Sequence, residues 1–147
     1  MNLRQLSLIA VCALSCGSLY AANDSDYKAS RDRVDADYKA EAAGCDKLSG
    51  NAKDICMAEA KGQEKVAKAE LKAKENDTPK NRYDVAVAKA DADYMVAKEK
   101  CDDMKGKEKR QCDKDAKAAK DSAKKQAKAD KDAASPKKER KMEKEAK

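Results

Sequence analysis

Cysteine is the residue type in this sequence with the clearest capacity for chemistry. The chain has six cysteines and no histidine. Four of the cysteines form two pairs with ten residues between the members of each pair: Cys45 and Cys56, then Cys101 and Cys112. Such thiols can form disulfides, bind a metal ion as thiolates, or take part in redox exchange.

The spacing within each pair favours disulfides. Zinc sites usually pair cysteines across two to four residues and often use histidine. A thioredoxin-like redox motif needs two residues between its cysteines. Neither pattern is present, so a metal site and free or redox-active thiols remain the less favoured alternatives.

Other chemistry has weaker support in the sequence. General acid–base catalysis most often uses histidine, and no Gly-rich phosphate loop occurs. The repeated carboxylates lie among lysines, where we expect a solvated helix face with ion pairs three or four residues apart; they are Asp35, Asp37, Asp91 and Asp93. We expect the tyrosines to be packing residues; they are Tyr27, Tyr38, Tyr83 and Tyr94. The sequence therefore predicts a protein that is not an enzyme, with no catalytic residue, cofactor or metal site.

The first 21 residues have the order of a secretory signal. Arg4 is followed by an apolar run at residues 6–14 and then by small residues. Cleavage after Ala21 fits best. The apolar run is too short for a membrane span of about 20 residues, and a lipoprotein signal that modifies Cys16 is a minority alternative. The sequence thus predicts a periplasmic or secreted protein without a transmembrane segment in its mature chain, in a compartment where disulfides form.

An internal repeat with an offset of 56 residues runs through the rest of the chain. Tyr38 recurs as Tyr94 and Gly50 as Gly106, without a gap. Tyrosine and glycine are rare in this sequence, so these matches carry more weight than those of alanine and lysine. The four cysteines belong to the same repeat, which indicates a duplicated unit with one cysteine pair in each copy.

The pattern of each copy predicts two helices joined near a glycine. Apolar residues recur every three or four positions, which makes one side of a helix. In the first helices these sides are thin, and in the first copy Arg31 and Glu41 interrupt them; they are Arg31, Val34, Tyr38, Glu41, Cys45 and Leu48, then Val87, Ala90, Tyr94, Ala97, Cys101 and Met104. In the second helices they are Ile55, Gly62, Val66, Ala69 and Ala73, then Cys112, Ala116, Ala119, Ala123 and Ala127. Gly50 and Gly106 follow the last apolar residue, where glycine commonly stops a helix, and Asn51 is a candidate cap for the next helix.

A turn at the glycine would place the cysteines of a pair level across a hairpin. Cys45 lies five residues before Gly50, and Cys56 lies six after it. If one helix ran straight through, the two would be about 16 Å apart along its axis, too far for a disulfide. The sequence therefore predicts a bridge from Cys45 to Cys56, and likewise from Cys101 to Cys112.

Composition completes the predicted architecture. Charged residues make up 42% of the chain, and there is no Trp or Phe, so it cannot build a deep core. Pro79 interrupts the helical pattern between the copies. We predict an all-α protein of long Ala-rich helices in two tandem hairpins: a signal peptide at residues 1–21, repeat one at 22–78, repeat two at 79–134, and a charged, disordered tail at 135–147.

The excess positive charge lies near the end of the chain. Residues 22–112 contain 20 basic and 20 acidic residues, whereas residues 113–147 contain 13 basic and 8 acidic residues. A basic segment can bind polyanions or anionic lipid. We expect mainly a structural, scaffold or stress-related envelope protein; the alternative is a polyanion- or anionic-membrane-binding module acting through this segment. Envelope proteins or an anionic surface are the expected partners, and nucleic acid is not.

Two resemblances agree with an exported helical protein. Residues 68–74, with the sequence KAELKAK, resemble the helical middle region of the envelope protein TolA in composition. The stretch from Cys45 to Cys56, preceded by Asp37 and Tyr38, is similar to a group of small exported proteins of Gram-negative bacteria. These resemblances imply a helical envelope protein and no particular activity.

Overall fold

The structure, a computed structural model, describes residues 19–135 and the side chains of residues 25–135. Four helices account for nearly all of this part: α1 (Leu19–Cys45), α2 (Gly50–Glu75), α3 (Pro79–Asp102) and α4 (Gly106–Ala134). The described residues contain no strand. The predicted all-α class with two tandem hairpins is confirmed: α1 and α2 form the first hairpin, and α3 and α4 form the second.

Two predictions fall largely outside this part. Residues 1–18, which hold most of the predicted signal peptide and Cys16, lie outside the described residues, and so does the predicted tail from residue 136 onward. Ala21 lies in the first turn of α1, and cleavage after it stays a prediction. Such cleavage would leave α1 as a helix of residues 22–45.

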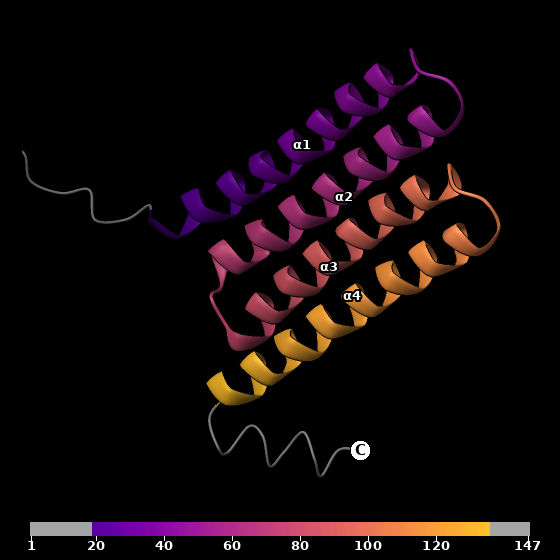
Figure 1. The fold of residues 1–147 in the computed structure, drawn as a ribbon. Coiled ribbons are helices and arrows are strands. Elements are labelled where there is room, and N and C mark those ends of the chain that lie inside the picture. Colours follow the sequence, from indigo (N-terminus) through magenta and orange to yellow (C-terminus); the bar gives the residue numbers. More distant parts are fainter. Residues whose placement is uncertain (1–18, 136–147) are drawn as a thin grey trace, which may run out of the picture.

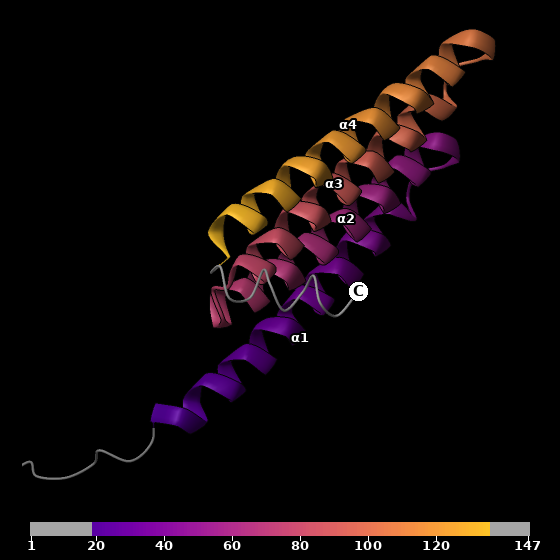
Figure 2. The ribbon, with the colours of Figure 1, turned by 90° about the horizontal axis from the view of Figure 1, so that it is seen from below.

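The four helices lie side by side in chain order, in an open layer one helix thick (Figure 1). Packing joins α1 to α2, α2 to α3, and α3 to α4, and no other pair of these helices packs extensively. α1 is held least tightly, since its contact with α2 is the least extensive of the three, and Figure 2 shows its first half extending beyond the other helices. The inner helices α2 and α3 therefore have two neighbours each, and the edge helices α1 and α4 have one.

The small size of the buried residues explains why this layer does not close into a bundle. The buried apolar residues are Cys45, Ala58, Ala60, Ala90, Cys101 and Ala127. None of them has a large side chain that could fill the centre of a four-helix bundle. Alanine allows helices to approach closely along a line of contact, and the remaining sides of each helix stay in solvent.

The connection between the two hairpins is short and well capped. Pro79 is the first residue of α3, where its fixed φ and missing N–H are tolerated. The Thr78 side chain accepts a hydrogen bond from the Asn81 backbone N–H at 3.0 Å. The Asn81 side chain is buried and donates to the Asn76 carbonyl at 2.6 Å. Pro79 thus begins a helix after a three-residue turn.

The glycines at the hairpin turns have a different role from the predicted one. α1 ends at Cys45, before the turn, and Gly50 is the first residue of α2 with a φ of 57°. Gly106 begins α4 in the same way, with a φ of 58°. Glycine adopts this left-handed conformation without the steric cost of a Cβ atom. The turn is where the sequence predicts it, but the glycine starts the second helix and does not stop the first. Leu48 and Met104, predicted to lie on apolar helix sides, lie in these turns and are exposed.

The two hairpins meet at a close contact between α2 and α3. A Cβ atom at Gly62 would lie 2.8 Å from the Ala92 Cβ and 3.3 Å from the Ala92 Cα. Real Cβ atoms do not approach so closely, so only glycine at position 62 permits this helix separation. The α2–α3 contact is the most extensive in the layer, and Gly62 lies within it.

Alanine substitutions at two helical glycines test this contact. Replacing Gly44, which has open space around it, should stabilise α1 by up to about 1 kcal/mol through helix propensity. Gly62→Ala gains the same propensity but overpacks the α2–α3 contact, at a cost of about 1–3 kcal/mol. Urea denaturation should therefore rank Gly44→Ala as the more stable variant, with Gly62→Ala at or below the unmodified protein. Equal stabilisation by both would contradict the close contact.

Candidate functional site: the two turns and the two broad faces

The two predicted disulfides are present at equivalent places in the hairpins. Cys45 bonds to Cys56, and Cys101 bonds to Cys112, each pair with a Cα–Cα distance of 5.6 Å. Cys45 is 1% exposed and Cys101 is 0% exposed. Their partners Cys56 and Cys112 are partly buried. Each bond joins the two helices of one hairpin.

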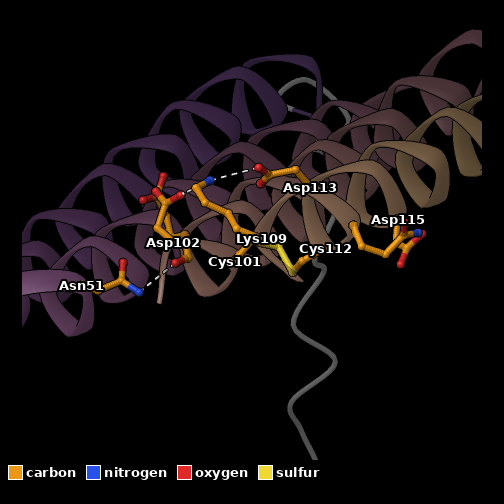
Figure 3. Close-up of a disulfide and its surroundings, with 9 residues drawn as sticks. Asn51, Cys101, Asp102, Lys109, Cys112, Asp113 and Asp115 are labelled. Carbon is orange, nitrogen blue, oxygen red and sulfur yellow. Dashed lines mark hydrogen bonds and ion pairs between the residues drawn. A yellow bond between two sulfur atoms is a disulfide. The ribbon is translucent and has the colours of Figure 1, made fainter. Parts of the chain in front are cut away.

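An ion pair spans each turn beside its disulfide. Lys53 Nζ lies 2.9 Å from Asp46 Oδ1, and Lys109 Nζ lies 2.7 Å from Asp102 Oδ1. These two pairs are related by the 56-residue offset. In the second copy Lys109 also contacts Asp113 at 2.9 Å (Figure 3). The hydrogen bond from Lys109 holds the pKa of Asp102 below its ordinary value, and the two carboxylates raise the pKa of Lys109.

Asn51 connects the first turn to the second hairpin. Its side chain donates from Nδ2 to the Glu99 carbonyl oxygen at 2.8 Å (Figure 3). Glu99 lies in the last turn of α3, where carbonyl groups have no partner within the helix. The prediction that Asn51 caps its own helix is therefore wrong: the residue lies inside α2 and satisfies the end of α3. The partner is 48 positions away, so local capping rules cannot find it.

The tyrosines are packing residues, as predicted, with one addition in the second copy. All four are partly buried. Lys120 Nζ lies 3.8 Å from the centre of the Tyr94 ring, and Lys131 Nζ lies 5.4 Å from that of Tyr83. Both distances suit cation–π contacts. The first copy has Glu64 and Glu75 at the equivalent positions, so these contacts belong to α4 alone.

Lysines form a row along one side of α2. Lys61, Lys65, Lys68 and Lys72 are spaced by three or four residues, which places them on one side of the helix. Lys68 reaches Asp35 of α1 at 2.7 Å, whereas Lys72 approaches Asp84 of α3 at 3.8 Å. A row that reaches both neighbouring helices lies on a broad side of the layer. We call this side the basic face.

The second copy repeats this arrangement. Lys124 of α4 contacts Asp91 of α3 at 2.7 Å, which matches the pair of Lys68 and Asp35 at an offset of 56 residues. The expectation for Asp35 and Asp91 is corrected here, since both carboxylates pair with a neighbouring helix. The signal was present in the sequence, because Lys68 and Lys124 share the offset of the two aspartates. The hydrogen bond from Lys68 lowers the pKa of Asp35.

The opposite side of the layer carries carboxylates around apolar grooves. Gln63 and Ala67 line two grooves, one shared with α1 and one shared with α3, so both grooves open on the same broad side. The groove between α2 and α3 has Val66 and Val96 among its lining residues. The acidic residues that line these two grooves are Asp37, Glu41, Glu59, Glu64, Glu70 and Asp93, and the only basic residue is Lys89. We call this side the acidic face.

Neither a metal cluster nor a membrane-spanning stretch occurs among the described residues. Within residues 25–135, no three His, Cys, Asp or Glu side chains gather where they could hold a metal ion. None of the four described helices has an apolar stretch of the length that a membrane crossing requires. Comparison with protein-family models, with curated proteins and with solved structures finds no match. The repeated turns and the two faces are therefore the candidate functional features of the described residues.

Removing one disulfide at a time should affect the edge helices differently. Each bond closes a short loop and stabilises the chain by roughly 2–3 kcal/mol. α1 packs less extensively than α4, so replacing Cys45 and Cys56 by serine should expose α1 to hydrogen exchange more than replacing Cys101 and Cys112 exposes α4. Exchange measured by mass spectrometry on both double variants tests this. Equal protection of α1 and α4 would contradict the expected difference.

The ion pair of Asp35 predicts how stability depends on acid. Because the pKa of Asp35 is lowered in the folded protein, its contribution is present above its ordinary value of 3.8 and is lost as the pH falls below that value. Asp35→Asn should therefore lower the thermal midpoint at pH 6, and the difference from the unmodified protein should shrink toward about pH 3. Asp37→Asn, on the acidic face, is the control for the loss of one negative charge, because Asp37 has no ion pair within the described residues; it should lower the thermal midpoint at pH 6 less than Asp35→Asn does. A constant difference for Asp35→Asn over this range would refute the assignment.

Proposed function

We propose that this chain is an exported, non-enzymatic envelope protein with a structural or scaffold role. The observation that supports this most is the open layer, in which each helix leaves two broad sides in solvent (Figure 1). Such a layer offers more surface per residue than a closed bundle. Both disulfides are internal to their hairpins, so each hairpin is braced at its own turn.

The envelope location is supported by the signal-like order of residues 1–21 and by the disulfides. Disulfides persist in oxidising compartments and are rare in the cytosol. Two of them in a protein with so few large buried side chains suit a compartment where they form reliably. The scaffold role and the location are therefore proposed together.

A substitution scan in living cells tests the scaffold role. The gene is deleted, envelope permeability is measured, and variants of the full chain are assayed for rescue. A scaffold should lose rescue at positions that hold the layer together, such as Cys45, Cys56 and Gly62, and should tolerate single changes of exposed polar residues. Loss of rescue concentrated in a compact cluster of exposed polar residues, in variants that still fold by circular dichroism, would point to an enzyme and overturn the proposal.

The second candidate is binding of polyanions through the basic C-terminal segment. Its support is the charge excess after residue 112. Several lysines of α4 already have partners within the molecule: Lys120 with Tyr94, Lys124 with Asp91, and Lys131 with Tyr83. This use of the cations leaves fewer of them for an external anion, so we place this candidate second.

A further inference from the structure

Charge on α2 is divided between its two solvent-facing sides. The basic face has Lys61, Lys65, Lys68 and Lys72, and Glu64 beside this row pairs with Lys68 at 2.6 Å. The acidic face has Glu59 and Glu70. Along the sequence these charges alternate and cancel. Around the helix they lie on opposite sides, because positions two residues apart differ by about 200°.

The second hairpin extends the basic face. Lys117 and Lys124 of α4 are the repeat equivalents of Lys61 and Lys68, whereas the equivalent of Lys65 is the exposed Asp121. Because Lys124 and Lys68 each pair with an aspartate of the preceding helix in the same way, the two lysine rows lie on the same broad side. Adjacent helix axes are 8–10 Å apart, so rows on α2 and α4 cover a surface roughly 20 Å wide.

The two equivalent lysines at the start of these rows are available to a partner. Lys61 and Lys117 are exposed, and neither has an ion pair or hydrogen bond within the described residues. Lys65, also exposed, donates only to the Met95 sulfur at 3.6 Å, a weak acceptor. The pairs formed by Lys68 and Lys124 brace the helices on this face and leave Lys61, Lys65 and Lys117 free to bind.

The thickness of the layer decides whether the acidic face cancels the attraction between the basic face and an anionic surface. A helix with its side chains is about 10–12 Å across, and the Debye length at 0.1 M salt is about 10 Å. An anionic surface in contact with the basic face is therefore at least one Debye length farther from the carboxylates of the acidic face than from the lysines. The carboxylates on the basic face itself, Asp35, Asp84 and Asp91, pair with Lys68, Lys72 and Lys124. At this salt concentration the acidic face is largely screened, and the basic face acts with its own charge.

We propose that the basic face binds the surface of an anionic phospholipid bilayer, with the helical layer lying parallel to it. A bilayer presents many negative groups over an area, which matches exposed lysines on two separate helices, Lys61 and Lys65 on α2 and Lys117 on α4. The interaction is electrostatic and requires no apolar insertion. This surface runs over α2 and α4 and shares Lys117 and Lys124 with the C-terminal segment considered above, but Lys61 and Lys65 lie outside that segment. The proposal does not depend on the scaffold role.

Two double variants test this proposal. Each reverses the charge of two lysines, one pair on the basic face and the other pair on the acidic face. Lys61→Glu with Lys117→Glu changes the basic face. Lys74→Glu with Lys100→Glu makes the same change in net charge on the other side, because Lys74 follows Ala67 by seven residues and Lys100 follows Asp93 by seven. All four lysines are exposed and have no ion pair within the described residues. The full mature chain is mixed with vesicles of phosphatidylglycerol and phosphatidylcholine in 0.1 M salt, and binding is measured by sedimentation.

The basic-face variant should bind about tenfold or more weakly, since each lysine near an anionic surface contributes substantially to the attraction. The control variant should bind within about twofold of the unmodified chain, and vesicles of phosphatidylcholine alone should bind none of them. Equal weakening by both variants would show a net-charge effect and overturn the proposal. No binding by the unmodified chain, or unchanged binding by the basic-face variant, would do the same.

Self-association is the remaining outcome that would overturn it. A basic face and an acidic face on one layer could also stack two copies of the chain. Sedimentation velocity without vesicles separates the two cases: the proposal expects a monomer whose behaviour the basic-face variant does not change. A concentration-dependent oligomer that dissociates in the basic-face variant would show that the acidic face of a second copy occupies this surface.

Discussion

Close approach of small residues between α2 and α3 is the constraint on which the rest of the layer depends. Gly62 and Ala92 lie at the contact that joins the two hairpins, and neither hairpin has large buried side chains of its own. Dispersion and burial depend on separation, so helices covered with alanine gain stability only when their axes are close. The same small side chains have too little volume to fill the centre of a closed bundle. Close packing along lines and an open layer are thus two consequences of one composition.

The edges of the layer show why it ends after four helices. The side of α2 that packs on α3 includes Ile55, Ala58 and Ala69, and the equivalent residues of α4 are Gln111, Lys114 and Lys125. Lys114 stands where Ala58 is buried, so a further helix could not pack there without burying its charge. This change resembles the polar outer faces of terminal repeats in solenoid proteins. The two hairpins are thus similar within, and they differ in charge on the side where α2 has a neighbour and α4 has none among the described residues.

Much of the fold could be predicted from the spacing of the cysteines and glycines. What could not be predicted is which helices pack against each other. Ten residues between the cysteines, with a glycine near the middle, were enough to predict each hairpin and its disulfide. The apolar sides of the second helices were harder to predict. In α2 the predicted side, with Gly62 and Val66, packs on α3 of the other hairpin. In α4 the predicted side, with Ala116 and Ala127, packs on α3 of the same hairpin. An inner helix has two packing sides and an edge helix has one. Sequence periodicity within one helix does not tell which of these a helix will be.

The two faces were hidden for a related reason. Equal numbers of acidic and basic residues between positions 22 and 112 suggest a region with little electrostatic field around it. Net charge, however, does not tell where on the surface the charges lie. Lys68 and Asp35 are 33 positions apart and form a pair at 2.7 Å, whereas Lys61 and Glu59 are two positions apart and lie on opposite sides of α2. Once the helices form a layer one helix thick, the distance between its faces is close to the screening length of the solvent. A chain whose net positive charge lies near its end can therefore also have a charged surface along its middle. That surface follows from the arrangement of the helices and not from the order of charges in the sequence.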